Sequence, residues 1–192
     1  MKYFPTFINL NNKKVLVIGA GYIAGKKLER LLDFTKNITV IAPEVSDKVK
    51  KLVDENRLTL QKREIQKKDV KDFSIVVIAV DDISVQKEIY EECQKYNILC
   101  NSVDSVEYCD FIFPSYIKKD SLTIAISTSG SSPSVAKYLK VAIENLIPDS
   151  IESFLDEMKK IRSTLPKGKE RMKLLDEKAK KYIDTIFKFT YH

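Results

Sequence analysis

Histidine and cysteine are scarce in this 192-residue sequence, and their scarcity narrows the available chemistry. The single histidine is His192, so histidine-based acid–base catalysis and histidine metal ligation are effectively excluded. The three cysteines form no C-x-x-C pair, which argues against a disulfide framework and against a zinc site: Cys93, Cys100 and Cys109. We therefore predict three buried thiols, no protein-bound metal, and a chemistry of carboxylates, hydroxyls, backbone amides and a cofactor.

Long apolar runs and a basic nucleic-acid patch are also missing. No stretch approaches the roughly 20 apolar residues that span a bilayer, and the first residues do not resemble a signal peptide. The net charge of +6 comes from lysines that are interleaved with acidic residues on expected helix faces. We predict a soluble cytoplasmic protein without a membrane or nucleic-acid partner, whose positive field would favour a polyanionic small molecule.

Short β-branched runs alternate with amphipathic helices over the first hundred residues. Residues 14–18 are typical of a strand buried on both faces, and Ala24, Leu28 and Leu31 then share one face of a helix. Further strands are expected at residues 38–41, 58–62, 75–80 and 98–103, and further helices at 46–56 and 84–96. This alternation predicts an α/β fold of the Rossmann type, with an open parallel sheet covered on both faces.

The pattern changes after Asp104. Strands are expected at residues 111–113 and 122–126, joined through the charged turn Lys118-Lys119-Asp120. Ser132 is an expected N-cap, with Pro133 at the first position of a helix whose apolar face comprises Val135, Leu139, Ala142, Ile143 and Leu146. Pro148 ends that helix, and two further helices at 150–164 and about 169–189 predict a small C-terminal helical domain.

A G-x-G-x-x-A motif runs from Gly19 to Ala24, between the first strand and its helix. Gly19 permits the tight turn, Gly21 lets the backbone approach a pyrophosphate, and Ala24 lets the helix lie close to the sheet. The phosphates would rest on the helix N-terminus, where free N–H groups favour negative charge. We predict a bound dinucleotide; the alternative is a tight strand–helix turn without a ligand.

The end of the second expected strand bears on which dinucleotide is bound. Ala42-Pro43 occupies the place where an acidic residue often holds the adenosine ribose, and Glu44 follows closely. No arginine lies nearby to receive a 2′-phosphate, and Lys48 is the one nearby cation. These residues favour NAD over NADP.

Side chains at the ends of the fourth and fifth strands are expected to face the nicotinamide half of such a cofactor. They are Val80, Asp81, Asp82, Asn101, Ser102 and Asp104. A carboxylate at this edge can take a proton from the substrate while a hydride leaves to the cofactor. Asp81 or Asp82 is better explained as a helix N-cap, which makes Asp104 the stronger candidate for the base.

A hydroxyl-rich run follows residue 126. Its members Ser127, Thr128, Ser129, Gly130 and Ser131 could hold substrate carboxylates with their hydroxyls and amides, in front of a helix N-terminus. A polar turn followed by an N-cap explains the same residues, and both interpretations stay open.

Together these blocks resemble the precorrin-2 dehydrogenase family of siroheme synthesis. The resemblance rests on the order and spacing of five blocks, which are residues 4–10, the G-x-G turn from Gly19, residues 79–82 (AVDD), residues 100–104 (CNSVD), and the pair 111–115 and 126–133. It implies an NAD-dependent oxidation of precorrin-2 to sirohydrochlorin, with Asp104 as the catalytic carboxylate. It also implies that Tyr22, Ile23, Pro43 and Glu44 contact NAD.

The resemblance further implies a homodimer whose subunits interlock through the region after Asp104. We therefore expect an NAD-binding domain at 1–113, a small α+β dimerisation segment at 114–147 and a helical domain at 148–192. Some family members also insert Fe²⁺ into sirohydrochlorin, and the sequence leaves this activity open. Thr128 replaces a serine of the larger family members. The competing hypotheses are a chelatase that relies mainly on metal insertion and a non-catalytic NAD-sensing interaction module.

Overall fold

The computed structural model describes residues 3–103 and 105–187, which fall into two compact units. The first unit runs from Tyr3 to Ile112, and the second begins at Phe113. Each unit has its own sheet and its own hydrophobic core, so each is described separately.

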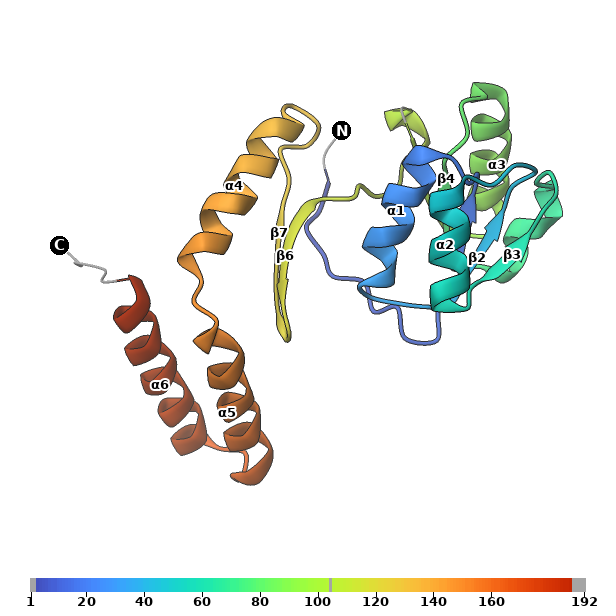
Figure 1. Cartoon of the computed structure of the whole chain (residues 1–192). Helices are drawn as coiled ribbons and strands as arrows, with labels where there is room; N and C mark the ends of the chain where they lie inside the picture. Colours follow the sequence, from blue (N-terminus) through green and yellow to red (C-terminus); the bar gives the residue numbers. More distant parts are fainter. Residues whose placement is uncertain (1–2, 104, 188–192) are drawn as a thin grey trace. The chain divides into compact units, whose positions relative to one another are not determined.

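The first unit is built on a five-stranded parallel sheet with the order β3-β2-β1-β4-β5 (Figure 1). Its strands are β1 (Val15–Ile18), β2 (Ile38–Ile41), β3 (Thr59–Gln61), β4 (Ile75–Ile78) and β5 (Leu99–Ser102). The strand order reverses direction next to β1, which is the Rossmann arrangement. The predicted fold class is confirmed, and each expected strand of this region is present within a few residues of its predicted bounds.

Helices cover both faces of this sheet. They are α1 (Tyr22–Leu32), α2 (Asp47–Asn56) and α3 (Ile83–Lys95), with the short 3₁₀ helices η1 (Lys67–Asp72) and η2 (Val106–Tyr108). Figure 1 shows α1 and α2 side by side, with α3 on the opposite side of the sheet. Ile89 and Cys93 of α3 pack into a buried cluster with Leu16, Ile18 and Ile78 of the strands.

The register aligns the carboxyl ends of four strands. Ile18 pairs with Ile41 and with Ile78, and Ile78 pairs with Ser102. The segments that follow these four residues therefore leave the sheet along one edge. In an open α/β sheet, ligands bind at this edge, beside the point where the strand order reverses.

Arg63 and Asp69 form an ion pair within the connection between β3 and β4. From this ion pair we predict that the stability of the fold depends on pH. Asp69 accepts hydrogen bonds from Arg63 Nη1 (2.6 Å), Arg63 Nη2 (2.9 Å) and the Gln66 N–H (2.8 Å). The Arg63 hydrogen bonds lower the pKa of Asp69. Its ionised form therefore stabilises the fold above the ordinary carboxyl pKa of about 3.9, and this stabilisation is lost as the pH falls further.

We expect Asp69→Asn to reduce the free energy of unfolding by about 1–2 kcal/mol at pH 7. The difference from the wild type should shrink toward pH 3, because the carboxyl of the unfolded wild-type chain then takes up a proton that the folded carboxylate, with its lowered pKa, does not yet bind. Urea unfolding at both pH values measures it. Asp72→Asn, at an exposed carboxylate of the same 3₁₀ helix, is the control and should change little. An equal loss at both pH values would contradict the ion-pair explanation.

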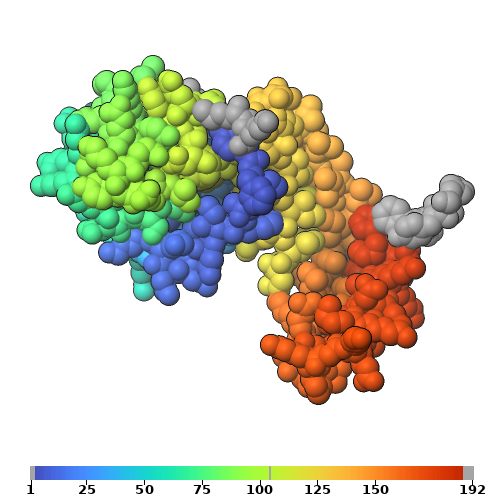
Figure 2. All heavy atoms as spheres, turned by 180° about the vertical axis from the view of Figure 1, so that it is seen from behind, coloured from blue at the N-terminus to red at the C-terminus, as the bar shows by residue number. Residues whose placement is uncertain are grey.

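The second unit contains a β-hairpin and three helices. The hairpin pairs β6 (Ser115–Lys119) with β7 (Leu122–Ile126), and α4 (Pro133–Leu146), α5 (Ser150–Thr164) and α6 (Lys169–Phe187) follow. Ile117, Ile147 and Ile151 form its buried core. α5 and α6 lie against each other (Figures 1 and 2). The rings of Phe154 and Tyr182 stack between them at a centroid distance of 4.0 Å.

Two predictions for the hairpin are wrong. Residues 111–113 form no strand, since the Phe111 carbonyl accepts a hydrogen bond from the Asn101 side chain (2.8 Å), and the first hairpin strand begins at Ser115. Lys118 and Lys119 belong to β6 instead of the turn, which lies at Asp120 with a φ of 43°. Lysines fit a strand here because the two-residue period leaves Lys118 exposed beside buried Ile117.

Candidate functional site

The turn after β1 needs glycine at its first position. Gly19 has a φ of 94°, and a Cβ added to it would lie 2.2 Å from the carbonyl oxygen of Ala79. Its N–H donates to the Ile41 carbonyl (2.9 Å). The turn is thereby held between the ends of β2 and β4, at the edge where the carboxyl ends of the strands align.

The second glycine leaves open space in front of a helix. Gly21 is the N-cap residue of α1, and no described atom lies within 4 Å of a Cβ added there. Because glycine has no side chain, it leaves the first N–H groups of α1 without a side-chain cap. Ser46, the N-cap of α2, donates to the Ala20 carbonyl (2.8 Å) and so supports the turn from its other side. The loop thus presents backbone donors and space, as a pyrophosphate requires.

The side chains expected to contact the cofactor line the same edge. Tyr22 and Ile23 open α1 and are 67% and 37% exposed, and the Lys26 ammonium lies 4.2 Å from the centroid of the Tyr22 ring. Pro43 and Glu44 form the exposed bend after β2. All four side chains are therefore accessible to a cofactor bound at this edge.

The two aspartates after β4 have different roles. Asp82 is the N-cap of α3, because its Oδ1 accepts from the N–H groups of Ser84 (2.8 Å) and Val85 (3.3 Å). A further hydrogen bond from the Ser84 hydroxyl is the main cause of the lowered pKa of Asp82. The predicted N-cap is confirmed for Asp82, whereas Asp81 is exposed beside half-buried Val80.

The end of β5 brings polar groups to the same edge. Asn101 is buried, accepts from the Lys27 ammonium (3.3 Å) and donates to the Phe111 carbonyl. Asp104 lies outside the described residues, and its role as the base remains a prediction. Ser102 and Ser105, on either side of it in the sequence, both donate to Gln86, which the sequence analysis did not single out. The signal was present, because Gln86 shares a helix face with buried Ile89 and Cys93.

The hydroxyl-rich run belongs to the second unit. Thr128 Oγ1 donates to the Ser132 carbonyl (3.0 Å) and accepts from the Ser132 N–H (3.1 Å), and Ser127 Oγ accepts from the Ser129 N–H. Ser132 caps α4 through the Val135 N–H (3.3 Å), as predicted. Ser129 and Gly130 have φ values of 51° and 87°. These hydrogen bonds fix the turn, and the exposed Ser129, Gly130 and Ser131 remain accessible to a ligand.

Similarity to known proteins bears directly on this edge. A family model described as "Putative NAD(P)-binding" matches residues 6–115, which include every residue of the first strand–turn–helix unit. The chain belongs to this family. The siroheme synthases of Pseudoalteromonas atlantica and Mannheimia succiniciproducens are 35% and 30% identical to it over 165 and 187 residues. These alignments cover 86% and 97% of this chain but 36% and 38% of the synthases, so the chain spans just over a third of their length.

A solved structure matches nearly the whole length of this chain. The precorrin-2 dehydrogenase SirC superposes with a TM-score of 0.75 at 25% identity, over 97% of this chain and 100% of SirC. The resemblance to the precorrin-2 dehydrogenase family is therefore confirmed, and so is the prediction of a nicotinamide dinucleotide as cofactor.

The cysteines, the possible metal ligands and the helices bear on the other predictions made from the sequence. Cys93 and Cys100 are buried as predicted, while Cys109 is half-buried. Within residues 3–103 and 105–187, no three His, Cys, Asp or Glu side chains gather as a metal site would require, and no helix is both long and apolar enough to cross a membrane.

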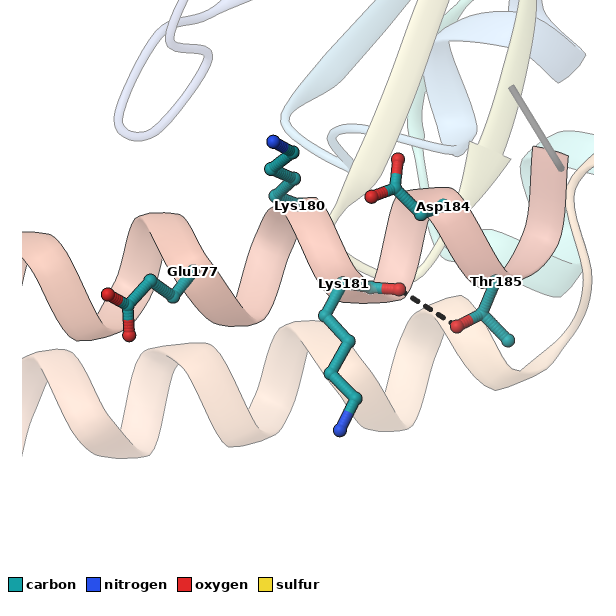
Figure 3. A pocket seen from close by; sticks show the side chains of 5 residues that line it. All are labelled: Glu177, Lys180, Lys181, Asp184 and Thr185. Atoms are coloured by element: carbon teal, nitrogen blue, oxygen red, sulfur yellow. Dashed lines mark hydrogen bonds between the residues drawn. The ribbon is translucent and has the colours of Figure 1, made fainter. Parts of the chain in front are cut away.

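A shallow hollow lies on the surface of α6. It is lined by Glu177, Lys180, Lys181, Asp184 and Thr185 (Figure 3). The Thr185 hydroxyl donates to the Lys181 carbonyl of the same helix (2.8 Å), and the lining comes from one helix face. It contains none of the residues expected to bind cofactor or substrate.

Proposed function

We propose that this chain is an NAD-dependent dehydrogenase that oxidises precorrin-2 to sirohydrochlorin in siroheme synthesis. The observation that carries the proposal is the shared edge of the sheet, where the Gly19 turn, the bend at Glu44, Val80 and the end of β5 come together. It occurs in a chain that matches the precorrin-2 dehydrogenase SirC over the whole length of SirC.

The oxidation removes one hydride and one proton from the substrate. NAD, when bound, would supply the hydride acceptor and be reduced to NADH. In the proposed mechanism the Gly19–Gly21 turn and the N-terminus of α1 hold the pyrophosphate, Glu44 holds the adenosine ribose, and Val80, Asp81 and Asn101 border the nicotinamide half. The Asp104 carboxylate would take the proton, since Asp104 comes two residues after the end of β5 in the sequence.

We propose that the hydroxyl-rich run recognises the substrate through its carboxylates. Ser127, Thr128, Ser129, Gly130 and Ser131 precede the N-terminus of α4, where the helix dipole favours negative charge. The net charge of +6 adds a long-range attraction for a polyanionic tetrapyrrole. Insertion of Fe²⁺ into sirohydrochlorin stays open, and a cytoplasmic location remains a prediction from the sequence.

The deciding experiment is an anaerobic absorbance assay with enzymatically generated precorrin-2 and NAD. Sirohydrochlorin and NADH should appear together in equal amounts. Repetition with NADP should give slower turnover, because Glu44 would repel a 2′-phosphate. If NAD bound and neither product appeared, the non-catalytic NAD-sensing module would replace the dehydrogenase.

We also propose a homodimer that forms through α4. An exposed apolar stripe runs along this helix at i, i+3, i+4 and i+11 spacing, and its members Val135, Tyr138, Leu139 and Leu146 are 44–70% exposed. Such a stripe at helical spacing is typical of a face that packs against another element. It lies beside the face that contains buried Ala136.

Leu139→Glu is expected to convert the dimer into a monomer, because a buried interface does not tolerate an unpaired carboxylate. Sedimentation velocity at micromolar concentration measures the change. Lys137→Glu adds negative charge to the same helix outside the stripe and should leave the dimer intact. A wild-type protein that sediments as a monomer would remove α4 as the interface.

A further inference from the structure

A buried glutamine connects the ends of two neighbouring strands. Gln86 of α3 is 2% exposed, and its Nε2 donates to the Val80 carbonyl after β4 (2.7 Å). Its Oε1 accepts from the hydroxyls of Ser102 (2.8 Å) and Ser105 (2.6 Å), at and just after the end of β5. The partners define the amide orientation, because a carbonyl can only accept and each hydroxyl can donate.

The Cys109 thiol contacts the backbone of the same two serines, Ser102 and Ser105. The Ser102 N–H donates to Cys109 Sγ (3.3 Å), and this sulfur lies 3.1 Å from the Ser102 carbonyl and 3.4 Å from the Ser105 carbonyl. Burial raises the pKa of the Cys109 thiol, which therefore keeps the proton that it donates to a carbonyl. Asn101 and Cys109 form an antiparallel bridge, so the chain at Cys109 runs back alongside β5. Residues 102 and 105 are thus fixed on both sides.

Packing alone does not explain a glutamine at this position. Gln86 shares the buried face of α3 with Ile89 and Cys93, where an apolar side chain of similar size would fill the space. A buried polar group is tolerated when every partner is in place, and a satisfied network then specifies one arrangement of its members. The arrangement specified here joins Val80 to Ser102 and Ser105.

We infer that Gln86 is a positioning residue: it links Ser102 and Ser105, which flank the base proposed at position 104 in the sequence, to Val80 at the carboxyl end of β4. The inference rests on the proposed function, in which Asp104 takes the substrate proton. A displacement of about 1 Å in such a group can cost about a hundredfold in rate. The effect should fall on kcat, since the phosphate-binding turn at Gly19 makes none of these hydrogen bonds.

The first test replaces Gln86 with methionine in the full-length protein. This substitution keeps the volume and removes all three side-chain hydrogen bonds. We expect kcat for precorrin-2 oxidation to fall about tenfold to a hundredfold, with the Kd for NAD changed by less than about threefold. The control is Ile89→Val, which removes one methyl group from the same helix face and should keep both values.

The second test is Gln86→Glu, whose neutral acid reproduces the hydrogen-bond pattern of glutamine. Its carbonyl oxygen can accept from both serines while its O–H donates to Val80, whereas the ionised form places a carboxylate oxygen against the Val80 carbonyl. The ratio of its kcat to that of the wild type should rise as the pH falls. Taking the ratio cancels the titration of groups common to both proteins, such as Asp82 and Cys109. A side chain that only fills space would give a flat ratio.

Amide hydrogen exchange of the peptide covering residues 100–110 provides a readout independent of turnover. Gln86→Met should lose protection there and Ile89→Val should not. Unchanged protection, or lost protection with a wild-type kcat, would overturn the inference while the proposed function stands. A wild-type protein that does not oxidise precorrin-2 would remove the proposed function, and the inference with it.

Discussion

Asp104→Asn should lower kcat for precorrin-2 oxidation by about 10²- to 10⁴-fold, the range expected when a general base is removed. Asparagine keeps the size of the side chain but cannot take a proton at neutral pH. The affinity for NAD should stay within about twofold, because the dinucleotide is proposed to bind mainly through the Gly19–Gly21 turn and the bend at Glu44. Anaerobic assays of kcat, together with calorimetric titration of NAD, separate the two effects.

The matched control for this variant is Asp82→Asn. Asp82 is also a carboxylate at the carboxyl edge of the sheet, but its Oδ1 caps α3 through the N–H groups of Ser84 and Val85. Its substitution should reduce stability slightly and leave kcat nearly unchanged. If Asp82→Asn abolished turnover and Asp104→Asn did not, the base would have to be assigned to the end of β4 instead of β5.

Most of the first unit follows from sequence patterns alone. Strands that are buried on both faces consist almost entirely of Val, Ile and Leu, and β1 and β4 are such runs, with every residue buried. Their alternation with amphipathic helices leaves few arrangements other than a parallel sheet. The glycine turn was predictable as well, because Gly19 follows a buried strand directly and precedes an amphipathic helix, and glycine takes the positive φ found there without strain.

The hairpin of the second unit was predicted less well, because its signals are weaker. The run at residues 111–113 is as apolar as a strand, yet its hydrogen-bond partner is the side chain of Asn101, ten residues away from Phe111. Single-sequence patterns do not reveal such a contact. Lys118 and Lys119 suggested a turn, but Lys118 lies on the exposed side of the strand, and Lys119, on the other side, pairs with Asp149 and donates to the Ile147 carbonyl.

The parts of the candidate site that the sequence analysis missed depend on side chains meeting across elements. Gln86, Ser105 and Cys109 come from a helix, a loop and the chain after a 3₁₀ turn, and their contacts span up to 19 residues. No local motif encodes such a network. A polar residue on an otherwise apolar helix face was its one visible trace, and the same trace is worth examining in other Rossmann sequences.

The two glycines of the turn should respond to the same substitution in opposite ways. Gly19→Ala is expected to reduce the free energy of unfolding by about 2–5 kcal/mol, since it combines an unfavourable positive φ with a severe overlap. The new Cβ would lie 2.2 Å from a backbone oxygen, that of Ala79, which cannot rotate away. Urea unfolding measures this loss without any ligand.

Gly21→Ala should fold with a loss below about 1 kcal/mol, because the φ of −82° at Gly21 suits alanine and open space surrounds the added methyl group. That open space is where the pyrophosphate is proposed to lie, so the Kd for NAD should rise at least about tenfold, or about 1.4 kcal/mol. Calorimetric titration of NAD into Gly21→Ala measures it, with the unfolding curve confirming an intact fold. A stable Gly21→Ala protein with wild-type affinity for NAD would place the pyrophosphate away from the N-terminus of α1.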